Sequence, residues 1–496
     1  MRQQFISFAA VVLAYGLPTA ADDRHWNVTS GHWNVPTNWL EGLVPLDVDT
    51  VYIANNGTCS VDAAINAACL GLDLGGYQTS GRVELSDGGR LTVYGNESIG
   101  GVALSSGYFV QTGGTHDIAG NLAMADFAAS AWYTLQGGQL LVGGSETVGG
   151  DEDAGSASFS QSGGEHVIAD SLTVGIGGRS SSVFRFSLSG DAHLSVGGDE
   201  TVGFQYGGGT SLFEQSGGLH TVAGDLRLGY GPLGASGTFV LDGDGQLSVD
   251  GDEYLASWDG QSGSFVQHTG VHSVGGTMYL GHTSGGVGSY EIAGGSLETK
   301  GLHVGYEGSG RLTMSDSDAS VTVSGLLSFG GDSTLTAVPG SAVDMMGSSF
   351  ETRTTSPAAL TDLANLNLIF EGGDADVDSF EVAGIDLGPI DQGFDLNFAL
   401  GMLTLGGEGT GQIRLFDDFD NHPGLLGSEA LYVDTLVLNA GSYLDLNGFN
   451  LYCRNLVGSL SIIDLSHGGS LALVPEPAAL CLLAFGGLAT ALRRRT

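Results

Sequence analysis

Short runs of alternating apolar and polar residues, broken by Gly, Asp and Ser, fill the segment 81–330. Alternation with a period of two is typical of β-strands, and breaks of this composition are typical of turns. The runs show no helical period. The pattern therefore predicts an all-β region made of short strands and tight turns.

The strand pattern repeats along the chain. Four segments align with one another: "YFVQTGGTHDIAG", "SFSQSGGEHVIAD", "LFEQSGGLHTVAG" and "SFVQHTGVHSVGG". Related segments such as "YTLQGGQLLVGG" lie between them, so the unit is about half the spacing of the four. The glutamines of the four segments, 50, 54 and 52 residues apart, are Gln111, Gln161, Gln215 and Gln267. The turn glycines, in steps of 24 to 28 residues, are Gly89, Gly114, Gly138, Gly164, Gly190, Gly218, Gly245, Gly270 and Gly295.

A unit of this length suits one rung, meaning one full coil, of a β-solenoid with three short strands. A single rung cannot bury its apolar side alone, so the stack is the folding unit. The repeated glycines suit turn positions with φ > 0. We therefore predict an all-β fold, a right-handed parallel β-helix (β-solenoid) with rungs of about 25 residues. A β-propeller is the main alternative, but the chain has no repeated blade motif of the Trp-Asp kind.

A column of histidines follows the repeat. Each lies two residues after a turn glycine in every second unit, and leucine takes the place in the units between. Equivalent atoms two rungs apart would be about 10 Å from one another, too far to share one zinc ion. We expect an inward or rim-facing structural column, and the alternative is an exposed face of Phe, Gln and His that grips sugars. The histidines are His116, His166, His220 and His272.

A series of glutamates lies eight to ten residues after turn glycines, at a different phase from the histidines. We therefore expect no ladder of His–Glu pairs. The glutamates are interpreted as solvated turn residues, with weak calcium binding as the alternative. They are Glu97, Glu146, Glu200 and Glu253.

Charge narrows the range of partners. The 496 residues include 15 Lys and Arg against 55 Asp and Glu, for a net charge of −40. Such a charge argues against nucleic acid and anionic membrane surfaces as partners. It favours solubility outside the cell, where divalent cations could bridge the protein to other polyanions.

Two cysteines lie ten residues apart, Cys59 and Cys69. They could form a disulfide after export, or they could be two small buried residues. Their spacing is not that of a metal site, and the sequence assigns no metal ligands.

Both ends of the chain carry export signals. Arg2, an apolar run over 5–17 and the small residues 19–21 have the order of a signal peptide. At the other end, residues 478–492 carry no charge and three arginines follow. As a helix this run would span about 22 Å, less than the roughly 30 Å of a bilayer core. We expect a signal helix at the start and a transmembrane helix with its end inside the cell.

Val474, Pro475, Glu476 and Pro477 precede the apolar run, and Arg493, Arg494 and Arg495 follow it. In this order the three elements resemble the PEP-CTERM sorting tail of exported bacterial proteins. The resemblance covers about the last two dozen residues, and an ordinary permanent anchor is the alternative. It implies recognition by an exosortase-type membrane protease, transient membrane insertion, removal of the tail, and association with exopolysaccharide or biofilm at the cell envelope.

The regions beside the repeats differ from them. Trp26, Trp33 and Trp39 lie in a segment that resembles the start of many autotransporter-like repetitive exported proteins. They suit a cap on the first rung, or a platform for sugars. After residue 330 the repeat fades into irregular β structure with one helix signal, Ser356 as N-cap and Pro357 at the first position. Alternate aspartates at 374, 376 and 378 are a weak calcium pattern.

These signals predict five segments. They are a signal peptide (1–21), a Trp-rich N-terminal β cap (22–80), β-solenoid repeats (81–330), an irregular β region with a C-terminal cap (331–470) and a sorting tail (471–496).

The sequence shows no Ser-His-Asp order, phosphate loop or metal triad. We therefore expect a secreted, non-enzymatic surface or extracellular-matrix protein that associates with exopolysaccharide. One alternative is a polysaccharide-binding adhesin, which a flat exposed row of aromatic residues would favour. Another is a β-helix polysaccharide lyase or glycosidase, which an acid cluster in one groove across neighbouring rungs would favour.

Overall fold

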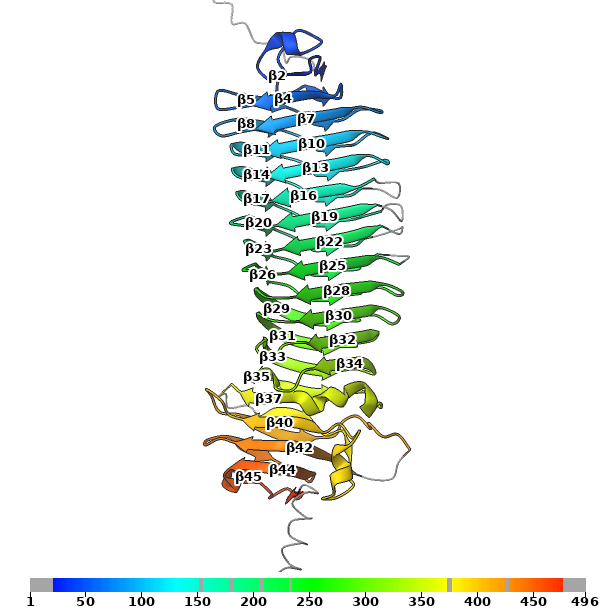
Figure 1. Cartoon of the computed structure of the whole chain (residues 1–496), viewed down its shortest axis with the longest axis vertical. Coiled ribbons are helices and arrows are strands. Elements are labelled where there is room, and N and C mark those ends of the chain that lie inside the picture. Colours follow the sequence, from blue (N-terminus) through cyan, green and yellow to red (C-terminus); the bar gives the residue numbers. More distant parts are fainter. Residues whose placement is uncertain are drawn as a thin grey trace, which may run out of the picture.

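The computed structural model describes residues 21–475, except 151–154, 178–181, 205–208, 232–233, 373–376 and 425–427. They form a tall all-β stack whose rungs follow the chain from one end to the other (Figure 1). The stack is a parallel β-solenoid of about 13 turns, with rungs of about 25 residues. Strands pair in parallel with their counterparts one rung later, so the solenoid prediction is confirmed and the β-propeller alternative is wrong.

Most rungs contain three short strands, as the repeat predicts. The first-face strands are β2 (Ser30–His32), β4 (Gly57–Val61), β7 (Ser80–Leu85), β10 (Ser106–Gln111), β13 (Ser130–Leu135), β16 (Ala157–Gln161), β19 (Val183–Leu188), β22 (Thr210–Gln215), β25 (Ser236–Leu241), β28 (Ser262–Gln267), β30 (Val287–Ile292), β32 (Ser309–Met314) and β34 (Asp332–Ala337). The second-face strands are β5 (Asn66–Cys69), β8 (Arg90–Val93), β11 (Thr115–Ile118), β14 (Gln139–Val142), β17 (Glu165–Ile168), β20 (His193–Val196), β23 (Leu219–Val222) and β26 (Gln246–Val249).

The third face completes each rung. Its strands are β1 (Asp23–His25), β3 (Thr50–Ile53), β6 (Gly71–Leu74), β9 (Glu97–Ile99), β12 (Leu122–Met124), β15 (Glu146–Val148), β18 (Leu172–Val174), β21 (Glu200–Val202), β24 (Leu226–Leu228) and β27 (Glu253–Leu255). Later rungs join the second and third strands into one, in β29 (Val271–Leu280), β31 (Ser296–Val304) and β33 (Ser320–Phe329).

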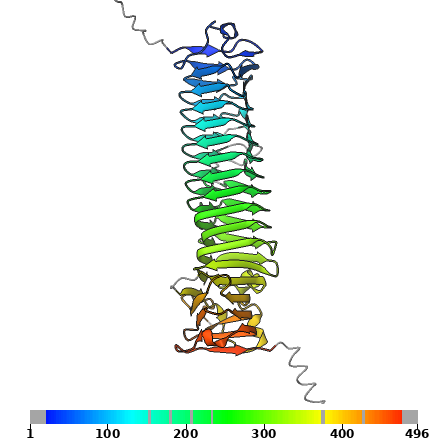
Figure 2. The same ribbon diagram turned by 90° about the vertical axis from the view of Figure 1, so that its left-hand side faces the viewer.

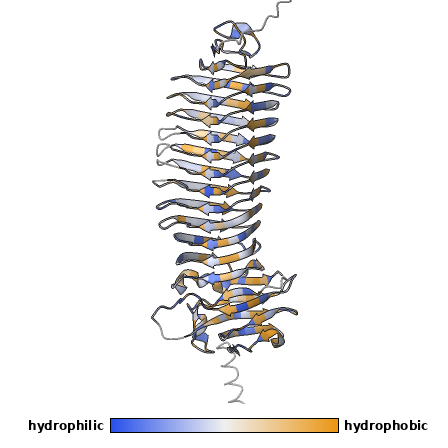
Figure 3. Ribbon diagram, turned by 180° about the vertical axis from the view of Figure 1, so that it is seen from behind, coloured by the Kyte–Doolittle hydropathy of each residue, from blue (hydrophilic) through white to orange (hydrophobic). Residues whose placement is uncertain are grey.

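The core consists of columns of equivalent residues, because alternate positions of each strand are buried. Hydrophobic and hydrophilic residues accordingly interleave along the rungs (Figure 3). The largest column contains stacked aromatic rings, with centroids of neighbouring rungs 4.6 to 5.0 Å apart. This matches the distance between hydrogen-bonded strands. Eight rings of successive rungs form this column. The eight are Phe109, Tyr133, Phe159, Phe186, Phe213, Phe239, Phe265 and Tyr290.

The turn after each first-face strand lies close to the backbone of the equivalent turn in the rung before, which favours glycine. Gly138 has φ of 82°, and a Cβ there would lie 2.3 Å from the carbonyl oxygen of Gly114 in the rung before. The expected positive φ is therefore confirmed at this turn, and steric contact between rungs adds a second reason for glycine.

Three tryptophans pack together at the N-terminal end of the stack. Trp26, Trp33 and Trp39 are all buried, and Trp39 packs edge-to-face against both others at 5.0 and 5.1 Å. The Trp39 indole N–H donates to the Trp33 carbonyl oxygen at 2.8 Å. The three rings are buried and have no free face, so the alternative of a sugar platform is wrong. A 3₁₀ turn, η1 (Pro36–Asn38), connects them.

The stack continues after residue 330 with longer loops (Figure 2). The expected helix begins at Pro357 as predicted, but it is the 3₁₀ helix η2 (Pro357–Asn365), and the Ser356 side chain makes no capping hydrogen bond. The other elements are β35 (Ser341–Met346), β36 (Ser349–Thr352), β37 (Leu366–Glu371), β38 (Asp378–Glu381), β39 (Gly384–Ile385), η3 (Asp391–Phe394), β40 (Leu400–Leu405), β41 (Gln412–Phe416), β42 (Glu429–Leu438), β43 (Tyr443–Asp445), β44 (Asn450–Gly458), η4 (Leu460–Ile462), β45 (Ile463–Asp464) and β46 (Ser470–Leu473).

Among the described residues, no helix is long and apolar enough to cross a membrane. The expected signal helix and the expected transmembrane helix lie outside the described residues.

Candidate functional site

The histidine column points inward. His116, His166, His220 and His272 have fully buried side chains, each stacked on a ring of the aromatic column. The prediction of a structural column is confirmed. The alternative of an exposed face of Phe, Gln and His is wrong, because these residues lie inside the solenoid.

The glutamate series is also buried, which corrects the interpretation as solvated turns. Each carboxylate lies 2.8 to 3.0 Å from the Nε2 atom of a histidine. The expectation of no His–Glu ladder is therefore wrong. It compared positions within one rung, whereas the glutamate belongs to the third strand of one rung and the histidine to the second strand of the next. The pairs are Glu97–His116, Glu146–His166, Glu200–His220 and Glu253–His272.

In two of the four pairs a tyrosine hydroxyl completes a network. The Tyr133 hydroxyl donates to Gln111 Oε1 at 2.7 Å and lies 3.0 Å from His116 Nδ1. Gln111 in turn donates to the carbonyl oxygen of Gln139 at 2.9 Å. We call this a tyrosine-bridged network. The second one contains Glu253, Gln267, His272 and Tyr290.

In the other two pairs phenylalanine replaces the tyrosine. Phe186 lies in the rung after His166, and neither His166 Nδ1 nor Gln161 Oε1 has a hydrogen-bond partner. We call this a phenylalanine network, and Glu200, Gln215, His220 and Phe239 form the second. All four networks are closed to solvent, so they serve packing and folding rather than substrate chemistry.

A different set of aromatic residues faces outward. Tyr254, Tyr279 and His303 follow one another on β27, β29 and β31, with ring centroids 5.2 and 5.1 Å apart. In the turns beside them, Tyr306 is 50% exposed and Trp258 is 47% exposed. We call this set the aromatic face. Its members are Tyr230, Tyr254, Trp258, Tyr279, His282, His303 and Tyr306.

The aromatic face was not predicted, although the sequence contains a signal for it. Tyr279 lies 25 residues after Tyr254, and His303 lies 24 residues after Tyr279, so all three hold one outward position of successive rungs. Burial lowers the pKa of His303 and that of His282 below the usual value for histidine. Both imidazoles are therefore neutral at neutral pH, and the face presents uncharged rings.

The aromatic face leads into two hollows on the same side. The first, of about 340 Å³, is lined by His303, Tyr306, Glu351 and Arg353 among others. The second, of about 250 Å³, shares Glu351 and Arg353 with the first. These two side chains form an ion pair at 2.9 Å between the hollows. The two hollows therefore extend the aromatic face toward the C-terminal rungs.

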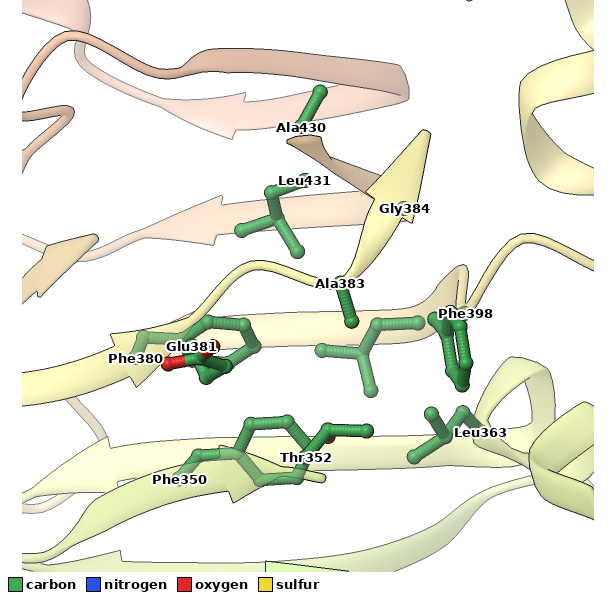
Figure 4. Close-up of a pocket in the computed structure, with 11 residues that line it drawn as sticks. Phe350, Thr352, Leu363, Phe380, Glu381, Ala383, Gly384, Phe398, Ala430 and Leu431 are labelled. Atoms are coloured by element: carbon green, nitrogen blue, oxygen red, sulfur yellow. The ribbon is translucent and has the colours of Figure 1, made fainter. Parts of the chain in front are cut away.

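Carboxylates gather in the second hollow, where Glu351, Glu381 and Asp418 come from β36, β38 and the segment after β41. Burial is the main cause that raises the pKa of Glu381 to about 7, and Asp417 and Asp418 raise it further. Figure 4 shows Glu381 beside Phe380 in a small apolar pocket. The sequence did not predict this acid cluster, because its members are far apart along the chain.

A second buried glutamate lies near the first. Burial, with repulsion from Asp417 next, raises the pKa of Glu429 to about 8. Elsewhere, one set of three His, Asp or Glu ligand atoms within 4.8 Å of one another occurs among the described residues, at Asp445, Asp464 and His467. Asp445 is paired with Arg414 at 2.8 Å, so this set already has a protein cation.

The remaining predicted residues lie away from these features. Cys59 and Cys69 are free, buried thiols on β4 and β5, which matches the interpretation as small buried residues; burial raises the pKa of both. Val474 is buried and its N–H donates to the Cys453 carbonyl oxygen at 2.8 Å, and Pro475 ends the described chain. The remaining sorting-motif residues, Glu476, Pro477, Arg493, Arg494 and Arg495, lie outside the described residues, as do Asp374 and Asp376.

Comparison of the chain with protein-family models, with curated proteins and with solved structures found no match. Function is therefore inferred from the residues of the site itself. The solenoid supplies a rigid support, the aromatic face offers uncharged ring surfaces, and the hollows add carboxylates and one arginine.

Proposed function

We propose that the protein is an exported, PEP-CTERM-sorted surface or extracellular-matrix protein that binds exopolysaccharide through its aromatic face. The observation that carries the proposal is an outward-facing, half-buried aromatic row that crosses successive rungs of a rigid solenoid, with the exposed rings of Trp258 and Tyr306 beside it. A patch of exposed rings on a soluble protein is typical of an interaction site. Tyrosine, tryptophan and neutral histidine combine an apolar body with a polar tip, which suits the mixed surface of a sugar.

The terminal signals and the charge support the same proposal. Export would bring the chain to the compartment where exopolysaccharide is found. A net charge of −40 disfavours nucleic acid and polyanionic glycans in the absence of bridging cations. We therefore expect uncharged polysaccharides to be the preferred ligands.

The acid cluster favours a second candidate function, cleavage of a polysaccharide. Glu351, Glu381 and Asp418 meet in one hollow that adjoins the aromatic face. Hydrolysis of a glycosidic bond uses two carboxyl groups on either side of the scissile bond. A chain bound along the aromatic face would extend toward this hollow.

The test uses the full chain with a panel of neutral and acidic polysaccharides, with retention and released reducing ends measured in the same tubes. The double variant Trp258→Ala/Tyr306→Ala should weaken retention about tenfold or more, as expected for exposed aromatic anchors. Trp132→Ala is the matched control, because Trp132 is 37% exposed and stacks on Tyr108 on the first face.

Each outcome decides between the candidates. Retention that falls in the double variant and not in the control supports the binding function. Equal retention in all three proteins would refute the aromatic face as the binding site. Reducing ends that appear with the wild-type chain and disappear in Glu381→Gln would establish the enzymatic alternative.

A further inference from the structure

The C-terminal end of the stack leaves its core open. The last rung consists of the end of β44, then η4, β45 and β46, and no further strand of the described chain lies beyond it (Figure 1). Its inward apolar side chains are only half-buried, whereas their partners one rung earlier are fully buried. The pairs are Leu456 opposite Leu436, Ile463 opposite Leu444, and Leu471 opposite Leu451.

The same end exposes large apolar side chains. Four of them are 52 to 58% exposed, and we call them the end patch: Val457, Leu460, Leu465 and Leu473. The last rung is also poor in charge, because residues 455–474 contain a single Asp, Glu, Lys or Arg, which is Asp464. An apolar patch of this kind on the surface of a protein is typical of an interaction site.

The backbone at this end has an open edge. In the described chain, β46 pairs with β44 alone, and residues 455–458 of β44 pair with β42 alone. The outer edges of both segments therefore present N–H and C=O groups that no neighbouring strand pairs, and such an edge is a template for another β-strand. A lipid surface would cover the end patch but would leave these backbone groups without partners. The open edge therefore favours a β-strand as the partner.

Charge favours a second copy of the chain as the source of that strand. A net charge of −40 makes two copies repel each other over most of their surface. The last rung is nearly uncharged, so two copies can approach each other there with little repulsion. A two-fold axis places the same patch on both molecules, and it allows their edge strands to pair in antiparallel orientation.

We propose that two copies of this chain associate end to end through their last rungs, with β46 of one copy pairing with β46 of the other. The two end patches then cover each other, and both open cores are closed. The product is a rod of twice the length, with the two N-terminal ends outermost. This inference does not depend on the proposed function.

The test is the mass of the full chain in solution, measured by sedimentation over a range of protein concentrations in about 0.15 M salt. We expect a monomer–dimer equilibrium. Leu460→Asp/Leu473→Asp places like charges opposite one another in the contact and should raise the dissociation constant at least tenfold. Leu40→Asp/Leu43→Asp is the matched control, because these leucines are 64% and 56% exposed in the N-terminal region, and it should leave the constant unchanged.

Hydrogen exchange supplies the second readout. The amides of β46 should exchange more slowly at high protein concentration than at low concentration in the wild-type chain and in the control. They should show no such difference in Leu460→Asp/Leu473→Asp. This readout separates the end patch from the apolar run 478–492, which all three proteins contain.

A wild-type chain that stays monomeric would overturn the proposal. So would a dimer that persists in Leu460→Asp/Leu473→Asp, since the contact would then lie elsewhere. Loss of association in Leu40→Asp/Leu43→Asp would overturn it as well, because it would indicate head-to-tail contacts. A monomer that floats with phosphatidylcholine vesicles, and no longer does so in Leu460→Asp/Leu473→Asp, would assign the end patch to lipid instead.

Discussion

The repeats and the C-terminal region both bury glutamates, and they treat them differently. In the repeats, Glu97 and its three equivalents each contact a histidine of the next rung. In the C-terminal region, Glu381 and Glu429 receive only backbone N–H groups, and their pKa values rise to about 7 and about 8. Burial alone therefore does not determine the pKa of a carboxyl group; the groups that it contacts also contribute.

Repetition explains the difference. The sequence repeats every two rungs, so the same glutamate and the same histidine come together at four levels. The histidine provides a partner for the buried carboxylate each time. The C-terminal rungs have long loops and strands of unequal length. Glu381 and Glu429 are not equivalent positions of a repeat, so no repeated partner lies beside them.

Replacing one histidine of the repeats should have the largest effect. His272→Leu leaves Glu253 buried without its partner and should lower the free energy of unfolding by about 3–5 kcal/mol. Adding Glu253→Leu should restore most of the loss, because neighbouring rungs hold apolar residues at both positions, Leu297 and Met278. Urea denaturation measures each step. His193→Leu, at an exposed position, is the control and should change stability by less than about 0.5 kcal/mol.

The C-terminal glutamates should make stability fall with rising pH when divalent cations are chelated. Their pKa values in the folded state, about 7 and about 8, lie above the unfolded value of 4.5. A carboxyl group whose pKa is higher in the folded state than in the unfolded state stabilises the fold. This stabilisation is complete at pH values below the pKa of the unfolded state, and it is lost as the pH rises through the pKa of the folded state. Denaturation at pH 6 and pH 9 should show the loss, and Glu429→Gln should reduce it. An unchanged slope in Glu429→Gln would show that Glu429 is already ionised at pH 6.

Removing one hydroxyl group should have a smaller effect. Tyr133→Phe leaves His116 Nδ1 and Gln111 Oε1 without the bridging group and should cost about 1–3 kcal/mol. It converts a tyrosine-bridged network into a phenylalanine network. Tyr94→Phe, at a position that is 54% exposed, serves as the control. Equal stability of both variants would mean that water replaces the hydroxyl at no cost.

The reverse change should have the smallest effect. Phe186→Tyr supplies a hydroxyl between Gln161 Oε1 and His166 Nδ1, which both lack a partner. We expect a gain of up to about 1 kcal/mol in thermal or urea unfolding, offset in part by the space the oxygen needs. A loss greater than about 1 kcal/mol would show that the phenylalanine networks are packed too tightly to accept it.

The sequence predicted the solenoid well, because alternation and the repeat length are local properties. The inward histidine column followed from the same register. Glu97 and its equivalents could not be placed by that reasoning, because their partners lie one rung away and on another face. The acid cluster at Glu381 could not be predicted either. Its members are far apart along the chain, and the loops of the C-terminal region bring them together.

The pairing across rungs also limits how this chain can change length. A glutamate on one rung needs the histidine of the next. Leucine takes the histidine place in the rungs that carry glutamate, and the glutamate place in the rungs that carry His116, His166 and His220. Gene duplication or deletion of a single rung inside the histidine-bearing part would set the alternation out of step and leave a charged side chain facing leucine. Units of two consecutive rungs can be added or lost without that cost. Two rungs are therefore the unit in which we expect the length of this chain to change during evolution.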